Sequence, residues 1–160
     1  MKTKFFPALV KMLTECEEDN EVWSDTIEGE DGTGNDAHSA ALAAIGRLSL
    51  DMKEQFMLEA CKPVFQQSFA HVDWKVRQAG FLTFGLIAES CRDYMKANLD
   101  DAMQTACKGL QDENPRVRYA GLSCLALVLT ELSPTAQFKY HKELVPVLLN
   151  IIANEKILKI

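Results

Sequence analysis

The sequence lacks several features that would define its class at once. No apolar run in its 160 residues approaches the ~18 that a membrane-spanning helix needs, and the N-terminal stretch has no small-residue cleavage site. It contains no Cys-x-x-Cys and no His and Cys spacing typical of zinc sites. Its five cysteines are odd in number and widely spaced, which favours reduced thiols over disulfides. We therefore expect an intracellular, soluble protein with no membrane contact, no metal and no cofactor.

Basic residues are missing from one long stretch. No Lys or Arg occurs between Lys11 and Arg47, whereas ten acidic residues lie from Glu15 to Asp36. The formal net charge is -6, but without these ten acids only 13 carboxylates stand against 17 basic residues. The acidity is therefore local. Because the basic residues are scattered and the dominant field is negative, we expect no direct binding of nucleic acid.

One phrase is written twice in the chain. The segments WKVRQAGFLTFGL (74–86) and PRVRYAGLSCLAL (115–127) lie 41 residues apart, and a third copy, AHSAALAAIGRL, precedes them at a spacing of 39. In each copy the apolar residues recur at steps of three and four, which predicts a helix with one apolar face. In the last copy this face consists of Val117, Ala120, Gly121, Cys124, Leu125, Val128 and Leu132.

Another amphipathic segment precedes each copy, and a fourth, HKELVPVLLNII, follows the last one. The order is helix A, turn, helix B at a period of about 40 residues, which is typical of HEAT or armadillo arrays. We expect an all-α fold, an α-solenoid of HEAT repeats with three full antiparallel hairpins and one further helix. Residues 1–160 would form a single segment of a much longer solenoid, since the chain starts within a helix A and ends on NEKILKI.

Residues around the last turn predict how the repeats are joined. Pro115 begins helix B, because proline suits the first helical turn. Asp112 and Arg118, six residues apart across the turn, suit a ladder of Asp and Arg pairs that links successive repeats. Gly80 and Gly121 each cost about 1 kcal/mol inside a helix relative to alanine. They indicate either a close approach to a neighbouring helix or only a well-packed helix.

These phrases together resemble a known family. DWKVRQAG, then NPRVRYAG, then SPTAQFKYHKELVPVLL resemble the middle HEAT repeats of the importin-β (karyopherin-β) family, most closely the importin-5 type, over residues 5–152. Two positions depart from the pattern: His38 stands where the arginine belongs, and His71 stands where an aspartate is expected. The ladder is therefore expected only in the last repeat. The repeat positions are Trp74, Arg77, Gly80, Asp112, Pro115, Arg118 and Gly121.

The resemblance implies a protein-binding segment of a nuclear transport receptor, which imports basic cargo under the control of GTP-bound Ran. It implies Ran, basic cargo proteins and nucleoporins as partners, and shuttling between cytoplasm and nucleus. The acidic stretch, residues 16–36, is similar to an acidic insertion of that branch, and its charges and glycines predict a flexible segment between helices. The candidate partner-binding residues are Glu17, Glu18, Asp19, Glu21, Trp23, Asp25, Glu28, Glu30, Asp31 and Asp36.

Other interpretations of the same residues stay open. The acidic stretch could serve only as a solvated linker, and Trp23 either packs the insertion onto the solenoid or contacts a ligand. A HEAT-repeat scaffold of the phosphatase-subunit or chromosome-organising type would have no transport role.

Sites for phosphate, calcium and catalysis find little support. The segment GEDGTGND has no lysine for a phosphate loop, and Leu42 stands at the twelfth position that an EF-hand gives to glutamate. We expect no enzyme activity, because cysteines on core-facing positions disfavour the thiolate and no histidine belongs to a nucleophile signature.

Overall fold

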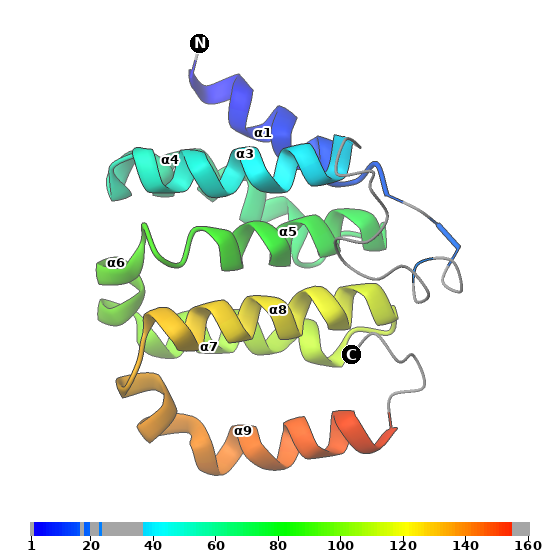
Figure 1. The fold of residues 1–160 in the computed structure, drawn as a ribbon, viewed down its shortest axis with the longest axis vertical. Helices are drawn as coiled ribbons and strands as arrows, with labels where there is room; N and C mark the ends of the chain where they lie inside the picture. The colour runs from blue at the N-terminus through cyan, green and yellow to red at the C-terminus, as the bar shows by residue number, and fades with distance from the viewer. Residues whose placement is uncertain (1, 17, 20–22, 24–36, 155–160) are drawn as a thin grey trace.

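The computed structural model describes residues 2–16, 18–19, 23 and 37–154. Within these ranges the chain forms helices and no strand, stacked in layers from the N-terminus to α9 (Figure 1). The helices are α1 (Lys2–Met12), α3 (Ala37–Asp51), α4 (Glu54–Ser68), α5 (Trp74–Leu86), α6 (Arg92–Ala97), α7 (Leu99–Lys108), α8 (Pro115–Glu131) and α9 (Thr135–Asn154), with a 3-10 turn η1 at Gly109–Gln111.

These helices form the hairpins that the repeat predicted. Helix α1 packs on α3, α4 packs on α5, and α7 packs on α8, while α9 is the further helix. The B helices α5 and α8 make the most extensive contact among the described elements, so successive repeats stack through their B helices. The predicted α-solenoid of three hairpins and one helix is confirmed.

The apolar face of α8 is the one that its sequence predicted. All seven residues of the face, from Val117 to Leu132, are buried. Burial of each large aliphatic side chain contributes about 1.5–3 kcal/mol, so this helix is held mainly by its packing. Its start is also as predicted: Pro115 occupies the first turn, and the Asn114 side chain accepts the Arg116 N–H at 2.9 Å. Asp73 caps α5 in the same way at 2.9 Å.

Helix A of the third repeat differs from the expected single helix, since it is broken into α6 and α7. Asn98 lies at the break with φ -121° and ψ 45°, outside the helical region. Its side-chain Nδ2 donates to the Tyr94 carbonyl at 2.9 Å, and its backbone N–H donates to the same oxygen at 3.0 Å. Asparagine competes in this way with regular helical bonding, which gives a local reason for the break.

Two repeat glycines allow a close approach, Gly121 to the backbone of η1 and Gly80 to the Ser68 side chain. A Cβ on Gly121 would lie 2.8 Å from the Gly109 Cα, and a Cβ on Gly80 would lie 2.6 Å from the Ser68 Cβ. Real Cβ atoms essentially never approach so closely. The close-approach interpretation of these glycines is therefore confirmed over the alternative of mere good packing.

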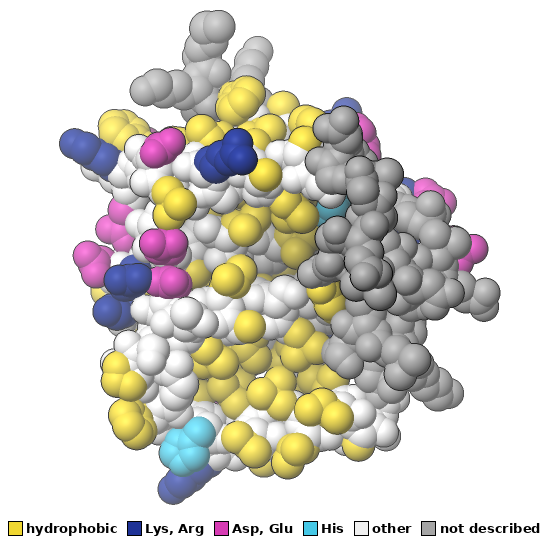
Figure 2. Space-filling model, viewed as in Figure 1, with side chains coloured by type: hydrophobic (Ala, Val, Ile, Leu, Met, Phe, Trp, Pro, Cys, Tyr) yellow, Lys and Arg dark blue, Asp and Glu magenta, His cyan; other side chains and the backbone are white. Residues whose placement is uncertain are grey.

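Helix α9 keeps much of its apolar surface open. Phe138, Leu149 and Ile152 are 77%, 61% and 71% exposed, and Figure 2 shows hydrophobic side chains gathered over α8 and α9. A HEAT hairpin generally leaves such a face for a neighbour to cover. None of the helices in the described ranges is long and apolar enough to cross a membrane.

Candidate partner-binding site

The start of the acidic insertion is docked on the solenoid. It crosses the N-terminal ends of the neighbouring B helices α5 and α8, where each helix begins. The Glu18 carboxylate forms an ion pair with the Lys75 ammonium, and the Cys16 thiol lies 3.9 Å from the Gln78 Oε1. Cys16 and Glu18 of the insertion thus both contact α5.

An arginine of α8 is enclosed by two tryptophans. The guanidinium carbon of Arg116 lies 5.1 Å from the centroid of the Trp23 ring and 5.1 Å from that of Trp74. Its Nη2 donates to the Asp19 carbonyl at 2.7 Å, and the side chain is 0% exposed. A buried cation is costly unless it is compensated. Here two ring faces and a carbonyl oxygen replace the lost water.

Trp23 packs the insertion onto the solenoid, whereas its contact with a ligand stays a prediction. Its ring meets the edge of Tyr119 on α8 at a centroid distance of 5.4 Å and an interplanar angle of 85°. Of the ten candidate residues, Glu18, Asp19 and Trp23 are described. The other seven lie outside the described residues: Glu17, Glu21, Asp25, Glu28, Glu30, Asp31 and Asp36.

Lys75 and Arg116 occupy the same repeat position, the second residue of α5 and of α8. Because α5 and α8 lie side by side, the two cations form a row that the insertion follows. The helix dipole disfavours cations at helix N-termini, so each needs an acceptor, and the insertion supplies one to each. The hydrogen bond to Glu18 accordingly raises the pKa of Lys75. Sequence reasoning missed both residues, although their spacing of 41 was a signal.

The ion pair that links successive repeats includes Asp112 as predicted, but its arginine is a different one. The Asp112 carboxylate accepts from Arg77, one repeat earlier, through Nε at 2.7 Å and Nη2 at 2.9 Å. Arg118 instead donates to the carbonyl oxygens of Asp112 and Glu113, at 3.0 Å each. The predicted pairing of Asp112 with Arg118 was therefore wrong. The turn before α8 lies beside the first turn of α5, and the two repeats meet there.

The two histidines that depart from the family pattern keep part of the missing roles. Nδ1 of His71 accepts the Asp73 N–H at 3.0 Å, as the Asp112 carboxylate accepts the Asn114 N–H at 2.9 Å. The Nδ1 of His38 lies 2.9 Å from the Leu13 carbonyl oxygen, to which its protonated tautomer donates. His71 therefore holds the turn before α5, and His38 links the start of α3 to the end of α1.

Three of the five cysteines are buried as predicted for core thiols, whereas Cys16 and Cys107 are partly exposed. Cys61, Cys91 and Cys124 are buried, and burial raises the pKa of each thiol. Burial also raises the pKa of Cys16, although the charges of Arg116 and Lys75 oppose it. High pKa values disfavour the reactive thiolate. The described part of the chain holds no group of three side chains fit to bind a metal ion.

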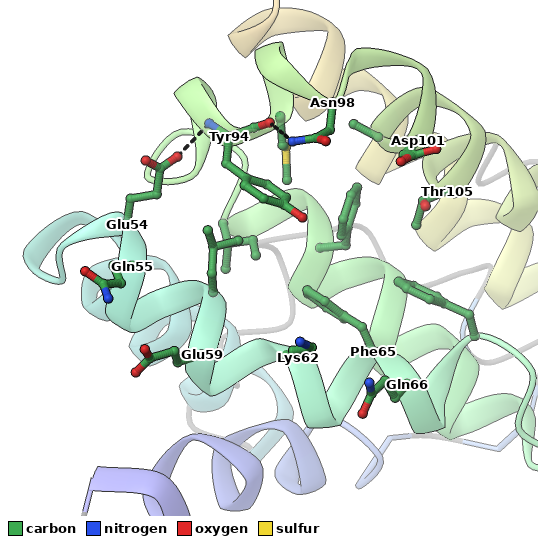
Figure 3. A pocket seen from close by; sticks show the side chains of 16 residues that line it. Glu54, Gln55, Glu59, Lys62, Phe65, Gln66, Tyr94, Asn98, Asp101 and Thr105 are labelled. Atoms are coloured by element: carbon green, nitrogen blue, oxygen red, sulfur yellow. Dashed lines mark hydrogen bonds between the residues drawn. The ribbon is translucent and has the colours of Figure 1, made fainter.

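A groove that the sequence did not predict lies between α4 and the α6–α7 pair (Figure 3). It has a volume of about 750 Å³, and its lining includes Phe65 and Phe84. Polar groups stand at its rim, including Glu59, Lys62 and Asp101. The groove can accommodate an apolar side chain.

Comparison with known proteins gives related segments in transport receptors. A model described as a HEAT-like repeat matches residues 74–128. The chain is 23% identical over 146 residues to importin subunit beta-3 of Saccharomyces cerevisiae, covering 90% of this chain and 13% of the relative. It is 27% identical over 111 residues to importin-4 of Mus musculus, covering 69% and 10%. The chain thus spans a small part of the length of these relatives.

Solved structures of Kap121p share the fold. The structures bound to Pho4p, to Nup53p and to RanGTP match with TM-scores of 0.85, 0.84 and 0.82, each at 21% identity. They cover 95%, 95% and 92% of this chain, which in turn covers 15% of each Kap121p chain. The chain is thus similar in sequence to importins and shares the HEAT-repeat solenoid fold of Kap121p.

Proposed function

We propose that this chain is a protein-binding segment of a nuclear transport receptor that imports basic cargo under the control of GTP-bound Ran. The relatives named importins support this, as do the Kap121p structures bound to RanGTP and to Pho4p. The structure bound to Nup53p supports nucleoporins as further partners. Such a segment shuttles between cytoplasm and nucleus. Residues 1–160 then act as one HEAT-repeat segment with residues 16–36 inserted between helices.

The observation that carries the proposal is the local acidity of the insertion, together with its place on the B helices. Ten acidic residues lie from Glu15 to Asp36, and the described start of this stretch crosses α5 and α8. A concentrated negative field attracts basic partners and speeds their association. The insertion therefore contacts Ran or a basic cargo segment through its carboxylates.

Neutralising the insertion tests this function. A variant with Glu17, Glu18, Glu28 and Glu30 changed to Gln and with Asp19 and Asp31 changed to Asn should bind RanGTP or a lysine-rich peptide more weakly. Each exposed pair contributes about 0–1 kcal/mol, so six together should lower the affinity by about one to two orders of magnitude at low salt. The loss should shrink at physiological salt, where charges are screened. Calorimetric titration at both salt concentrations measures this.

A control variant separates the effect of the insertion's carboxylates on affinity from the effect of the net charge. It carries the same number of neutralised acids at exposed positions outside the insertion, namely Asp51, Glu59, Glu89, Asp93, Asp101 and Glu143. We expect it to bind nearly as the unaltered chain does, and circular dichroism should show equal helical content in all three proteins. Equal affinities and equal salt dependence in all three would contradict the proposal. That result would favour a HEAT-repeat scaffold with no transport role.

A further inference from the structure

The described candidate residues of the insertion already hold cations of the chain itself. Glu18 is paired with Lys75, while Trp23 covers Arg116 and the Asp19 carbonyl accepts from it. The groups that the proposed function assigns to a basic partner are therefore occupied from within. A partner that uses them must displace these two side chains.

Lys75 and Arg116 present the pattern of a short basic segment. They stand on neighbouring helices at one repeat position, and the insertion supplies an acceptor to each, the Glu18 carboxylate to Lys75 and the Asp19 carbonyl to Arg116. An extended peptide with spaced cations could meet the same acceptors. Lys75 and Arg116 thus resemble two cations of the basic peptide that the chain is expected to bind.

The contacts around Arg116 would suit any guanidinium that reached the same place. They include two ring faces, at 5.1 Å each, one carbonyl oxygen at 2.7 Å and a hydrogen bond with the Cys16 side chain, and none of these involves the backbone of α8. Trp74 belongs to α5, whereas Trp23 comes from the insertion. A shift of the insertion would therefore open one side of the enclosure and leave Trp74 in place.

We propose that Trp23, Trp74, Glu18 and the Asp19 carbonyl form an exchangeable cation-binding site, which Lys75 and Arg116 occupy until an arginine- and lysine-rich partner segment replaces them. The inference rests on the proposed function, because it takes the basic partner from there. It adds that the docked insertion competes with that partner. The observed affinity is then reduced by the fraction of molecules in which the site is occupied from within.

Removing the internal cations tests the competition. In the full 160-residue chain, Lys75→Met with Arg116→Met should bind a short arginine-rich peptide about tenfold more tightly, if the internal occupant fills the site about nine-tenths of the time. Lys53→Met with Lys62→Met removes the same charge from exposed positions of the second repeat. This control should change the affinity by less than about twofold, because those cations lie outside the site.

A spectroscopic measurement covers the case in which loss of Arg116 prevents folding. The chain has two tryptophans, so Trp74→Phe leaves Trp23 as the single reporter while it keeps an aromatic face beside Arg116. Addition of the peptide should shift the Trp23 emission to the red as its ring leaves Arg116 and Tyr119. The shift should disappear at high salt together with binding.

The outcomes separate this inference from the proposed function. Tighter binding by the Lys75 and Arg116 variant, beyond its control, or a red shift of Trp23 on binding supports exchange. Peptide binding that is equal or weaker in that variant, with Trp23 emission unchanged at saturation, overturns exchange and leaves the proposed function standing. Failure of the peptide to bind any of these proteins at low salt overturns both.

Discussion

Replacing Gly121 with alanine is expected to destabilise the fold, whereas the same replacement of Gly46 should stabilise it. A Cβ on Gly121 would lie 2.7 Å from the Gly109 carbonyl carbon and 3.0 Å from the Leu110 nitrogen. These are backbone atoms and cannot rotate away. Overpacking costs about 1–3 kcal/mol, and the helix gains about 1 kcal/mol from alanine. Because the clash is with rigid backbone, we take the upper part of the cost, so a net loss of up to about 2 kcal/mol should remain.

Gly46 provides the matched control on α3. The nearest atom to its added Cβ is the Leu86 Cδ2 at 3.9 Å, an ordinary van der Waals distance. Only the helix term then applies, which should raise the free energy of unfolding by up to about 1 kcal/mol. Urea unfolding of both variants measures the difference. A Gly121→Ala protein as stable as the Gly46→Ala protein would show that η1 yields without cost and that the two backbones need not touch.

Periodicity predicted the parts of this fold that depend on neighbouring residues along the chain. The buried face of α8, its capping by Asn114 and the start at Pro115 all follow from the order of residues within one helix. The glycines indicated either a close approach or only a well-packed helix, and the distances in the structure decide for the close approach. Because the repeats stack with equivalent helices together, the period of about 40 residues also predicted that α5 lies beside α8.

The site depends on contacts far apart in the sequence, which no local pattern contains. Arg116 and Asp19 are 97 residues apart, and α8 alone gives no sign that this cation is buried. The break at Asn98 was missed because the apolar pattern continues through it. The partner of Asp112 was predicted to be Arg118, because it is only six residues away along the chain. The actual partner, Arg77, is 35 residues away and is brought close by the stacking of the repeats. In each case the local sequence allowed more than one arrangement, and contacts with residues distant in the sequence selected the one observed.

Asp112→Asn is expected to lower the free energy of unfolding by about 3 kcal/mol near neutral pH. Both partners are largely buried, with 11% of the Arg77 side chain and 12% of the Asp112 side chain exposed. Loss of one partner leaves the other charge uncompensated, which costs about 3–5 kcal/mol in buried pairs. We take the lower end because asparagine can still accept one hydrogen bond from Arg77.

The same Asp-to-Asn substitution at an exposed position provides the control. Asp100→Asn removes a carboxylate that pairs with Lys139 of the following repeat, but those side chains are 72% and 49% exposed. Water screens that pair, so the unfolding free energy should hardly change. If the two variants lose equal stability, burial of the Arg77 and Asp112 pair is not what joins the repeats.

The pH dependence of this loss gives an independent check of its cause. Burial alone would raise the pKa of Asp112, but hydrogen bonds from Arg77 and the Asn114 N–H, together with the Arg77 charge, lower it below its usual range. A carboxyl with a lowered pKa in the folded state stabilises the fold fully above its unfolded pKa of about 3.9. That contribution is lost as the pH falls through the folded pKa. The gap between the unaltered chain and Asp112→Asn should therefore stay constant from about pH 7 to 5 and narrow below about pH 4. A gap that persists undiminished in acid would mean that the substitution acts through packing, with the charge pair contributing little.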